Sequence, residues 1–580
     1  EAAPKAASTT ATSADAANTK FADFECIDPN IKKIIFERKI RIEGGFTLKG
    51  TASTPLTVEG GLNSGIELNG DKTGGMRLKV KTNIPITSGS YTVSESIADG
   101  LTADINAGKP ENWIFDDYAG ALTWTAGAAS SDDKTKWDKA GNWLPRGIPG
   151  IKTDVKIESG KAAYPKLEST TNAKAKTVTV NSGAQLDLAS FVITDDSGGT
   201  SFAPLEIFGT LKMTGTSGQT TWLGKTAADD KITHKPGSTV AYYGTTNNAL
   251  WGGPYKNLTV EKDRETIKVV STPLKVDEKF TVESDPSDRS VTVDAPGQTY
   301  KGAANIGANT TFKSAPSINF MQPVNAGVKN LLFNGGGAVS FGNTLNAGTV
   351  TAIVPTSLTV NGAVTLSGDL KAKNLTVNTA TVTAAKIEVR EATTVNTAAT
   401  ITATAVGPAT QIYNGVVMLS ADTEFKAKTS LLFAGTTSLS SSTSPKKNVE
   451  LKSPVVEIRG DVDVNNVTIT DIDTATKTKT ITTGGTITAA GFYAQASEKI
   501  ILKGAVKLSD RFTQTGTAAV QIGAPITDGA GTGLPLNGIS FASKNLYLVV
   551  TPPATTTFDP SPSAVTKPDD CNIFVAGDLT

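Results

Sequence analysis

The sequence predicts an all-β protein in which a parallel β-helix, or β-solenoid, follows an N-terminal β-sandwich. Three observations lead to this prediction: a composition rich in Thr, Ala, Val, Gly and Ser, short runs of alternating apolar and polar residues, and an internal repeat. With 580 residues the chain is too long for one ordinary hydrophobic core. Its apolar fraction of 38% and aromatic fraction of 6% suit narrow cores built from β-branched side chains.

The repeat is the strongest of these observations. A motif of Gly, two small or branched apolar residues, any residue, Leu or Ile, and then Ser or Gly starts at Gly302, Gly362, Gly415 and Gly504. Two of these copies are parts of longer segments that share nine identical residues, all at the same separation along the chain. The shared residues are Gln298, Tyr300, Gly302, Ala308, Thr310, Phe312, Lys313, Ser317 and Phe320, which recur as Gln411, Tyr413, Gly415, Ala421, Thr423, Phe425, Lys426, Ser430 and Phe433. A gapless offset of this kind identifies a repeat protein. The unequal spacing of the four motifs favours a solenoid with insertions over identical tandem domains.

The N-terminal part is predicted to hold an arm and a sandwich. Residues 1–20 are small and polar, with too little apolar surface to fold alone. We expect this arm either to exchange onto a neighbouring subunit or to lie along its own domain. Residues 21–120 alternate with a period of two and carry turn signals such as Asn69-Gly70, which predicts a β-sandwich.

Within that sandwich, the stretch Ile84 to Ile105 resembles the pilin-type, prealbumin-like modules of bacterial surface proteins. The resemblance rests on the strand Gly-Ser-Tyr-Thr-Val-Ser-Glu, which runs from Gly89 to Glu95. In some members of that family the corresponding Glu promotes an isopeptide bond between a Lys and an Asn. The resemblance implies the same role for Glu95, although no matching pair of Lys and Asn can be identified.

Residues 121–170 form a Trp- and Pro-rich module, in which Trp124, Trp137 and Trp143 are followed by Gly-Ile-Pro and Tyr-Pro. This pattern resembles a module that precedes repetitive β segments in large bacterial extracellular proteins. The resemblance implies a capping element whose aromatic rings cover the end of a solenoid. The alternative interpretation is a sugar-binding platform made by the three Trp rings.

Residues 171–536 are predicted to form the β-solenoid itself. Short strands, such as those in KNLTVEKD and TSLTVNGAVTLSG, follow one another between turns rich in Gly, Asn, Asp and Ser. In such a coil each strand lies about 4.8 Å above its counterpart in the previous turn. Branched apolar side chains then line the core, Gly occupies the corners and Thr forms rows outside.

Two stretches of the repeat region, GQTYKGAANIGANTTF and TQIYNGVVMLSADTEF, carry a further resemblance. Both resemble the Q-x-Y-x-G-x-V-x-L-x-A-x-T-x-F repeats of filamentous-haemagglutinin-like and autotransporter-like bacterial surface proteins. The likeness extends with varying strength over residues 235–515. It implies an elongated parallel β-helix displayed outside the cell.

Residues 537–580 are predicted to hold a closing strand, NLYLVV, a Pro-rich extended stretch and a terminal strand. Cys571 lies in this last part and Cys26 lies near the other end, and the chain has no other cysteine. A disulfide between them would suit an exported protein. Two unpaired buried thiols are the alternative.

Charge and hydropathy argue against two classes of partner. Lys plus Arg and Asp plus Glu both number 55, so the net charge is zero and nucleic-acid binding is not expected. No apolar run is long enough to cross a bilayer, so membrane insertion is not expected either. The chain starts at Glu1 without Met, as it would after removal of a signal peptide or in a form cut for expression. We expect an extracellular or cell-surface location.

Catalytic groups are scarce in the sequence. His234 is the only histidine and lies in a turn-like stretch, so we expect neither a catalytic triad nor a multi-histidine metal site. Asp461, Asp463 and Asn465 alternate so that they point to one face of a strand. Such oxygen ligands are a candidate Ca²⁺ site, because Ca²⁺ takes six to eight oxygens. A solvated acidic face is the alternative interpretation, and no other cofactor is expected.

These features together favour a secreted structural protein that is not an enzyme. We expect a self-assembling subunit of a cell-surface fibre, sheath or surface layer, with copies of itself as partners and residues 1–20 as one route of contact. A glycan- or host-binding adhesin that uses Trp124, Trp137 and Trp143 is the second hypothesis. A polysaccharide-degrading β-helix enzyme is the third.

Overall fold

Parallel β-strands that coil around narrow cores make up most of the described chain, which confirms the predicted all-β solenoid. The computed structural model describes residues 19–576 apart from 52–54, 61–64, 70–71, 77, 82–85, 89–90, 95, 100–112, 129–133, 145–146, 169–172, 196–201, 218, 220–231, 245–249, 262, 270–271, 285–288, 314–316, 336, 353–356, 407–409, 474, 517, 523–525, 529–537, 542–544, 550–564 and 567–571. The chain divides into two compact units, Glu1–Trp251 and Gly252–Thr580. Among the described residues, no helix is long and apolar enough to span a membrane.

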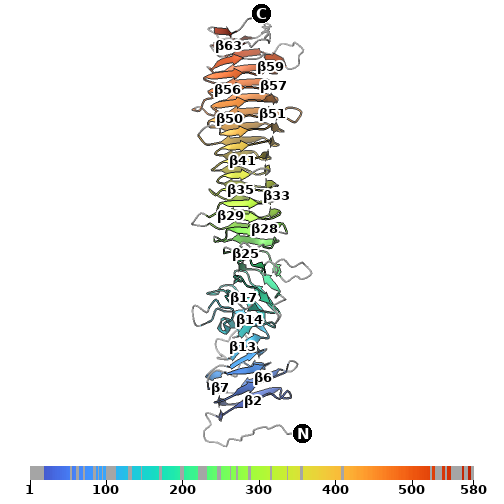
Figure 1. The fold of residues 1–580 in the computed structure, drawn as a ribbon, viewed down its shortest axis with the longest axis vertical. Coiled ribbons are helices and arrows are strands. Elements are labelled where there is room, and N and C mark those ends of the chain that lie inside the picture. Colours follow the sequence, from blue (N-terminus) through green and yellow to red (C-terminus); the bar gives the residue numbers. More distant parts are fainter. Residues whose placement is uncertain are drawn as a thin grey trace. The chain divides into compact units, whose positions relative to one another are not determined.

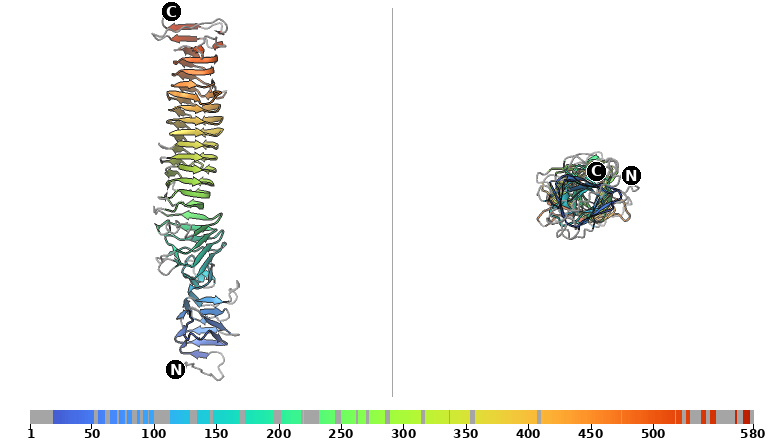
Figure 2. Two further views of the ribbon diagram at one scale, coloured as in Figure 1. Left: turned by 90° about the vertical axis from the view of Figure 1, so that its right-hand side faces the viewer. Right: turned by 90° about the horizontal axis from the view of Figure 1, so that it is seen from below.

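In the second unit each coil contributes one strand to each of three faces. The strands within a face are parallel, and those of successive coils stack in register (Figures 1 and 2). On one face, for example, Leu331 pairs with Val350, and Val350 pairs with Leu370 of the following coil. Backbone hydrogen bonds between neighbouring strands set the separation of the coils at about 4.8 Å. We number the faces 1, 2 and 3 in the order in which the chain visits them.

The strands of each face are as follows. Face 1 contains β30 (Gln298–Tyr300), β33 (Ser317–Phe320), β36 (Ala338–Phe341), β39 (Ser357–Val360), β42 (Asn374–Val377), β45 (Thr393–Val395), β48 (Val417–Leu419), β51 (Thr437–Ser441), β54 (Asp461–Asp463) and β61 (Ile526–Asp528). Face 2 contains β31 (Ala303–Ile306), β34 (Val324–Asn325), β37 (Leu345–Ala347), β40 (Val364–Leu366), β43 (Thr381–Ala384), β46 (Ala399–Ala403), β49 (Thr423–Ala427), β52 (Val449–Lys452), β55 (Asn466–Thr470), β62 (Gly538–Phe541) and β64 (Val565–Thr566). Face 3 contains β27 (Thr266–Lys268), β29 (Val291–Asp294), β32 (Thr310–Lys313), β35 (Leu331–Phe333), β38 (Val350–Ala352), β41 (Leu370–Ala372), β44 (Ile387–Val389), β47 (Gln411–Tyr413), β50 (Ser430–Phe433), β53 (Val455–Ile458), β56 (Thr480–Thr483), β58 (Lys499–Leu502), β60 (Ala519–Ile522), β63 (Asn545–Val549) and β65 (Asn572–Ala576). Four longer strands run through both face 1 and face 2: β26 (Tyr255–Val260), β28 (Leu274–Val282), β57 (Ile487–Gln495) and β59 (Val506–Thr515).

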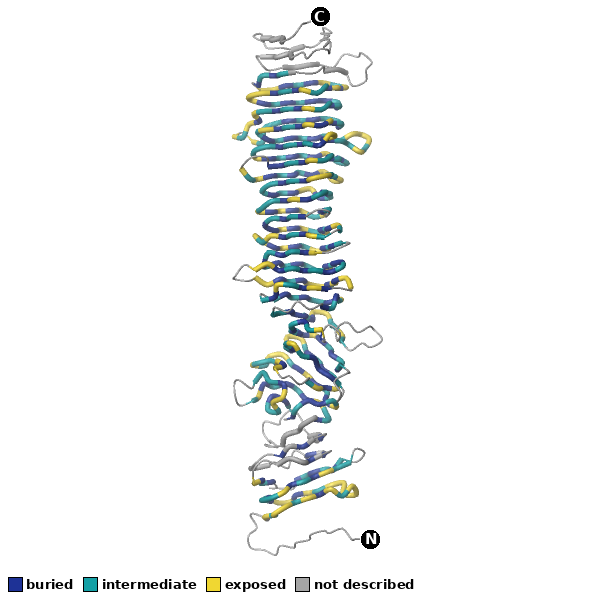
Figure 3. The backbone as a smooth tube through the Cα atoms, viewed as in Figure 1, coloured by how far each residue is buried: buried dark blue, intermediate teal, exposed yellow. Residues whose placement is uncertain are grey.

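The core of this unit is built by side chains that stack from coil to coil. Buried and more exposed residues alternate along the strands (Figure 3), as a period of two requires. Equivalent inward positions therefore lie above one another. The ring centroid of Phe320 lies 4.7 Å from that of Tyr300 and 5.2 Å from that of Phe341, with interplanar angles of 9° and 4°.

Glycine makes the corner between faces 3 and 1 narrow enough for this stacking. Five consecutive coils place a glycine there: Gly415, Gly435, Gly460, Gly485 and Gly504. A Cβ atom on Gly460 would lie 1.9 Å from the carbonyl oxygen of Gly435, and one on Gly504 would lie 2.0 Å from that of Gly485. Backbone sits directly on backbone at this corner, so only a residue without a side chain fits. The predicted role of the glycine motif at corners is confirmed.

The duplicated segment of the sequence does not return to the same face. Gln298 lies in β30 of face 1, whereas its counterpart Gln411 lies in β47 of face 3. In both copies the Gln side-chain amide is buried and donates to two backbone carbonyls in strands of the preceding face, those of Val293 and Lys313 in the first copy and of Ile401 and Lys426 in the second. The Tyr hydroxyl two residues later donates to the Gln side chain in each copy, at 2.8 and 3.1 Å. The second copy therefore repeats the strands and corners of the first copy, but each of its strands lies one face earlier in the coil.

The first unit also contains small sheets, and their strands pair in parallel rather than in the hairpins expected of the predicted N-terminal β-sandwich. Its sheets consist of β1 (Thr19–Phe21), β4 (Lys39–Ile42), β7 (Gly65–Leu68) and β10 (Ile86–Ser88); of β3 (Lys33–Phe36), β6 (Leu56–Gly60), β9 (Leu78–Lys81) and β12 (Ile97–Asp99); of β2 (Phe24–Cys26) and β5 (Phe46–Leu48); and of β8 (Lys72–Met76), β11 (Tyr91–Ser94), β13 (Trp113–Tyr118) and β16 (Gly147–Pro149). The pairing is parallel, and each strand pairs with one about a coil away; Ile40, for example, pairs with Ile66. Alternation with a period of two shows which side of a strand is buried, but it does not distinguish a hairpin partner from a partner one coil away.

Further parallel sheets continue the first unit after residue 120. They comprise β14 (Ala121–Trp124), β17 (Asp154–Ile157), β19 (Thr177–Val180), β22 (Leu205–Ile207) and β24 (Ile232–His234), with β15 (Trp143–Leu144) antiparallel to β14; β18 (Ala173–Lys174) and β21 (Ile193–Thr194); and β20 (Gln185–Asp187), β23 (Thr210–Met213) and β25 (Thr239–Tyr242). A short 3-10 helix, η2 (Ala140–Asn142), precedes β15. The pilin-like strand β11 pairs in parallel with both β8 and β13, so it belongs to a coil. Glu95 lies outside the described residues.

Both ends of the chain carry predictions of their own. The strand expected from NLYLVV is confirmed as β63, which pairs with β60 and β65 on face 3. Residues 1–18 of the arm and Cys571 lie outside the described residues, so the strand exchange and the disulfide stay predictions. Cys26 is buried in β2, and burial raises the pKa of its thiol.

We predict that Gly460→Ala destabilises the second unit by about 1–3 kcal/mol or more, because the added Cβ forces backbone apart in two coils. Gly297→Ala is the matched control, since Gly297 is also buried but its nearest neighbour would lie 3.7 Å from the new atom. Denaturant unfolding followed by circular dichroism measures both. Equal midpoints for the two variants would contradict the steric role of the glycine stack.

Candidate functional site

The three Trp residues proposed as a sugar platform are buried, so that interpretation is wrong. Trp124, Trp137 and Trp143 are 0%, 6% and 2% exposed. The ring of Trp143 packs edge-on between the other two, with centroid distances of 4.9 Å to each. The indole N–H of Trp124 donates to the carbonyl of Ala163, and that of Trp143 donates to the carbonyl of Trp137. A sugar needs an exposed ring face, and these rings instead form an aromatic core.

The Trp module does not cap an end of the solenoid either. β13 and β16 extend the sheet that begins with β8, while β14 is followed in its own sheet by β17 and β19. The module therefore lies within the first unit, between coils on both sides.

The candidate Ca²⁺ ligands each have a different protein partner. The Asp461 carboxylate accepts the N–H of Thr486 at 2.7 Å, and Asp463 forms an ion pair with Lys446. The Asn465 amide donates to the side chain of Asn448 at 2.9 Å. Within the described ranges, no group of three Asp, Glu, His or Cys side chains could hold a metal ion. The structure does not bring these ligands together, and a calcium site stays a prediction.

His234 lies at the end of β24, where its ring stacks on Trp251 with centroids 5.4 Å apart. The sequence predicts an exposed loop at this position, but the residue is half-buried and in a strand. The stacked indole gives the imidazole an apolar neighbour. Its surroundings suit a packing role.

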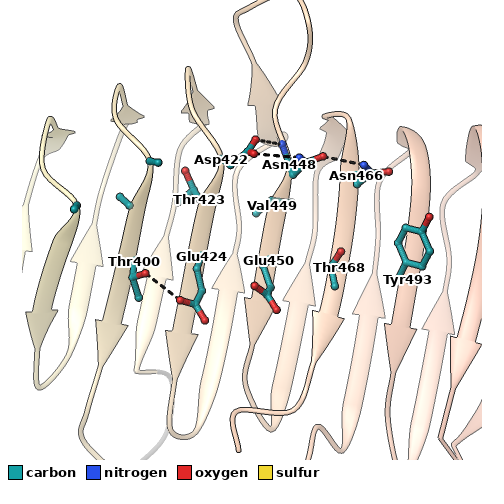
Figure 4. A pocket seen from close by; sticks show the side chains of 13 residues that line it. Thr400, Asp422, Thr423, Glu424, Asn448, Val449, Glu450, Asn466, Thr468 and Tyr493 are labelled. Carbon is teal, nitrogen blue, oxygen red and sulfur yellow. Dashed lines mark hydrogen bonds between the residues drawn. The ribbon is translucent and has the colours of Figure 1, made fainter.

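A groove of about 720 Å³ crosses successive strands of face 2. Figure 4 shows the outward side chains of its floor, one from each coil: Thr400 of β46, Glu424 of β49, Glu450 of β52, Thr468 of β55 and Tyr493 of β57. The strand register places these residues in one row, since each pairs with the next. The remaining lining consists of Ala380, Ala398, Ala399, Asp422, Thr423, Asn448, Val449 and Asn466.

Lys452 holds the two central glutamates of the groove. Its ammonium lies 2.7 Å from Glu424 and 3.0 Å from Glu450. Burial acts to raise the pKa of Glu424, but hydrogen bonds from Lys452 and Thr400 outweigh it and leave that pKa below its ordinary value. A general acid needs the opposite shift, so Glu424 stays ionised at neutral pH and serves as an acceptor.

A chain of polar side chains forms the rim of the groove at the corner before face 2. The carboxylate of Asp422 accepts both the backbone N–H and the side-chain amide of Asn448, at 2.8 and 3.2 Å. Asn448 in turn accepts the side-chain amide of Asn466 at 2.8 Å. These bonds, drawn in Figure 4, link one carboxylate and two amides from three successive coils.

The Tyr493 ring forms the far end of the groove because the neighbouring outward position has no side chain. Gly491 precedes it by two residues on the same strand, and a Cβ there would lie 2.7 Å from Cε2 of the Tyr493 ring. The ring is therefore free to lean along the sheet. It remains half-buried rather than covered.

Sequence reasoning missed this groove. The strands TEFKA and VELK carry Glu-x-Lys at matching outward positions, and only the strand register shows that they are neighbours. No protein-family model matches the chain, and no curated protein and no solved structure matches it either. The groove is therefore interpreted from its own chemistry.

The ion pair of Glu424 predicts a pH dependence. Because the folded pKa is lowered, its stabilising contribution is complete above the ordinary pKa of 4.5 and is lost as the pH falls through the folded value. We expect the thermal midpoint of Glu424→Gln to fall less than that of the wild type between neutral pH and about pH 3. Glu388→Gln, which removes a surface partner of Arg390, is the control and should follow the wild type. Parallel curves for all three proteins would contradict the assignment.

Proposed function

We propose that this protein is an extracellular structural subunit that assembles end to end with copies of itself into a fibre, sheath or layer. The parallel solenoid supports the proposal, because its end strands expose hydrogen-bonding groups. The resemblance to bacterial surface repeats agrees with a location outside the cell. The main support for the proposal is that the first coil exposes both a strand edge and apolar side chains.

The strands of the first and last coils pair on one side only among the described strands. β1, β2 and β3 pair with β4, β5 and β6, and at the other end β64 and β65 pair with β62 and β63. Joining the last coil of one copy to the first coil of another continues each sheet in the same strand direction. Such a head-to-tail contact is heterologous, and it propagates into a filament when the copies stack along the axis of the coil and no ring closes.

The first coil also exposes an apolar patch. Ile27, Ile31 and Ile35 are 50%, 42% and 50% exposed, and all three lie within or beside β2 and β3. Exposed large apolar side chains that cluster at an open sheet edge favour contact with a second protein surface. A second copy of the chain offers both the strand edge and the matching direction.

An adhesin is the second candidate function, and the groove on face 2 favours it. The Trp residues that suggested this role are buried, so the groove takes their place as the binding surface. Both functions are compatible, since one uses the ends of the solenoid and the other uses its side.

The assembly proposal predicts that replacing Ile27, Ile31 and Ile35 together by Lys abolishes concentration-dependent assembly, because charges would be buried at the contact. Electron microscopy and analytical ultracentrifugation of the purified full chain measure this. The control replaces Val328 and Val406 by Lys, which are 76% and 84% exposed in the second unit, and should assemble like the wild type. A wild-type protein that stays monomeric at all concentrations, or stops at a dimer, would contradict head-to-tail assembly.

A further inference from the structure

We propose that the groove on face 2, between Ala380 and Tyr493, binds a linear, uncharged, hydroxyl-rich oligosaccharide. The proposal stands apart from self-assembly, because the groove is formed by the side of the second unit and not by an end. It rests on the shape of the groove, its hydrogen-bonding groups, its charge and its one aromatic ring.

The shape suits an extended ligand that crosses several coils. Ala380, Ala398 and Ala399 line one end, and larger side chains at the exposed positions 380 and 398 would fill the groove. The floor is a rigid parallel sheet, and each coil adds one outward side chain about 4.8 Å further along. A polymer with a short regular repeat, lying across the strands, meets one such side chain after another.

The hydrogen-bonding groups suit hydroxyls, which both donate and accept. Glu450 accepts Lys452 and Thr470 through Oε1, while Oε2 receives no hydrogen bond within the described part of the chain. Glu450 lines the groove, so this oxygen is an acceptor available to a ligand there. The Thr468 hydroxyl can donate and accept, whereas the Thr400 hydroxyl donates to Glu424 at 3.0 Å and offers a ligand acceptor capacity.

The charge of the groove selects against anionic glycans. Three carboxylates line it, from Asp422, Glu424 and Glu450, and no Lys or Arg is among its lining residues. Lys452 lies beside the two glutamates and compensates part of their charge. A uronic-acid or sulfated polymer would place like charges together, whereas an uncharged sugar meets acceptors that are already oriented.

Tyr493 supplies the apolar contact that sugars require. The C–H face of a sugar ring packs on an aromatic face, while the Tyr hydroxyl remains available to a ring hydroxyl. Gly491 leaves the space that lets the ring lie along the sheet. The aromatic ring at one end and the glutamates in the middle thus form one row of contacts.

The test is isothermal titration calorimetry of the full chain with three hexasaccharide probes. Two are uncharged, of β-1,4-linked glucose and of β-1,4-linked N-acetylglucosamine, and the third is the anionic hexamer of galacturonic acid. We expect at least one uncharged probe to bind and the anionic probe to bind more weakly. Tyr493→Ala should weaken the binding about tenfold, whereas Tyr493→Phe, which keeps the ring, should stay within about threefold.

Thr513→Ala is the matched control, because Thr513 pairs with Tyr493 in the next coil but does not line the groove. It should bind like the wild type, and thermal unfolding should give similar midpoints for all variants. The proposal is overturned if neither uncharged probe binds, if the galacturonate hexamer binds more tightly, or if Tyr493→Ala binds as the wild type does. Assembly of Tyr493→Ala into the same particles as the wild type separates this result from the proposed structural role.

Discussion

The fixed separation of about 4.8 Å between successive coils is the constraint on which the rest of the structure depends. Every side chain meets its counterpart from the coil above and the coil below at that distance. Inside, flat rings stack face to face, as Tyr300, Phe320 and Phe341 do. At the corner between faces 3 and 1, the same spacing brings backbone onto backbone, and glycine is the residue that permits it.

Outside, the same spacing limits where charges can be placed. Asp277 lies between Lys256 and Lys301 of the coils on either side, and their hydrogen bonds, that of Lys301 foremost, lower its pKa. Amides stack as donors and acceptors, as where Asn378 donates to Asn361. A like-charged pair in register is unfavourable. Glu424 and Glu450 are such a pair, held together by Lys452, and this departure from the rule coincides with the groove.

The sequence was sufficient to predict the strands, the glycine corners and the all-β solenoid, because these follow from local periodicity and backbone sterics. It was not sufficient to predict pairing partners. Residues 21–120 have the alternation of a sandwich, yet Ile40 pairs with a strand one coil later. The groove was missed for the same reason, since Glu424 and Glu450 become neighbours only through the register. The Trp residues suggested a sugar site because of their residue type, but in this narrow fold their bulky rings are buried in the core.

The displacement of the duplicated segment from face 1 to face 3 has a consequence for how such a chain can change over time. Faces 1 and 3 both accommodate the same buried Gln and Tyr pair with the same hydrogen bond between the two side chains. Gain or loss of one strand with its corner would therefore leave the interior intact and rotate everything that follows by a third of a turn. The outward side chains of later strands could therefore move to another face without new packing in the core. The surface of the protein could change in this way while its core stays the same.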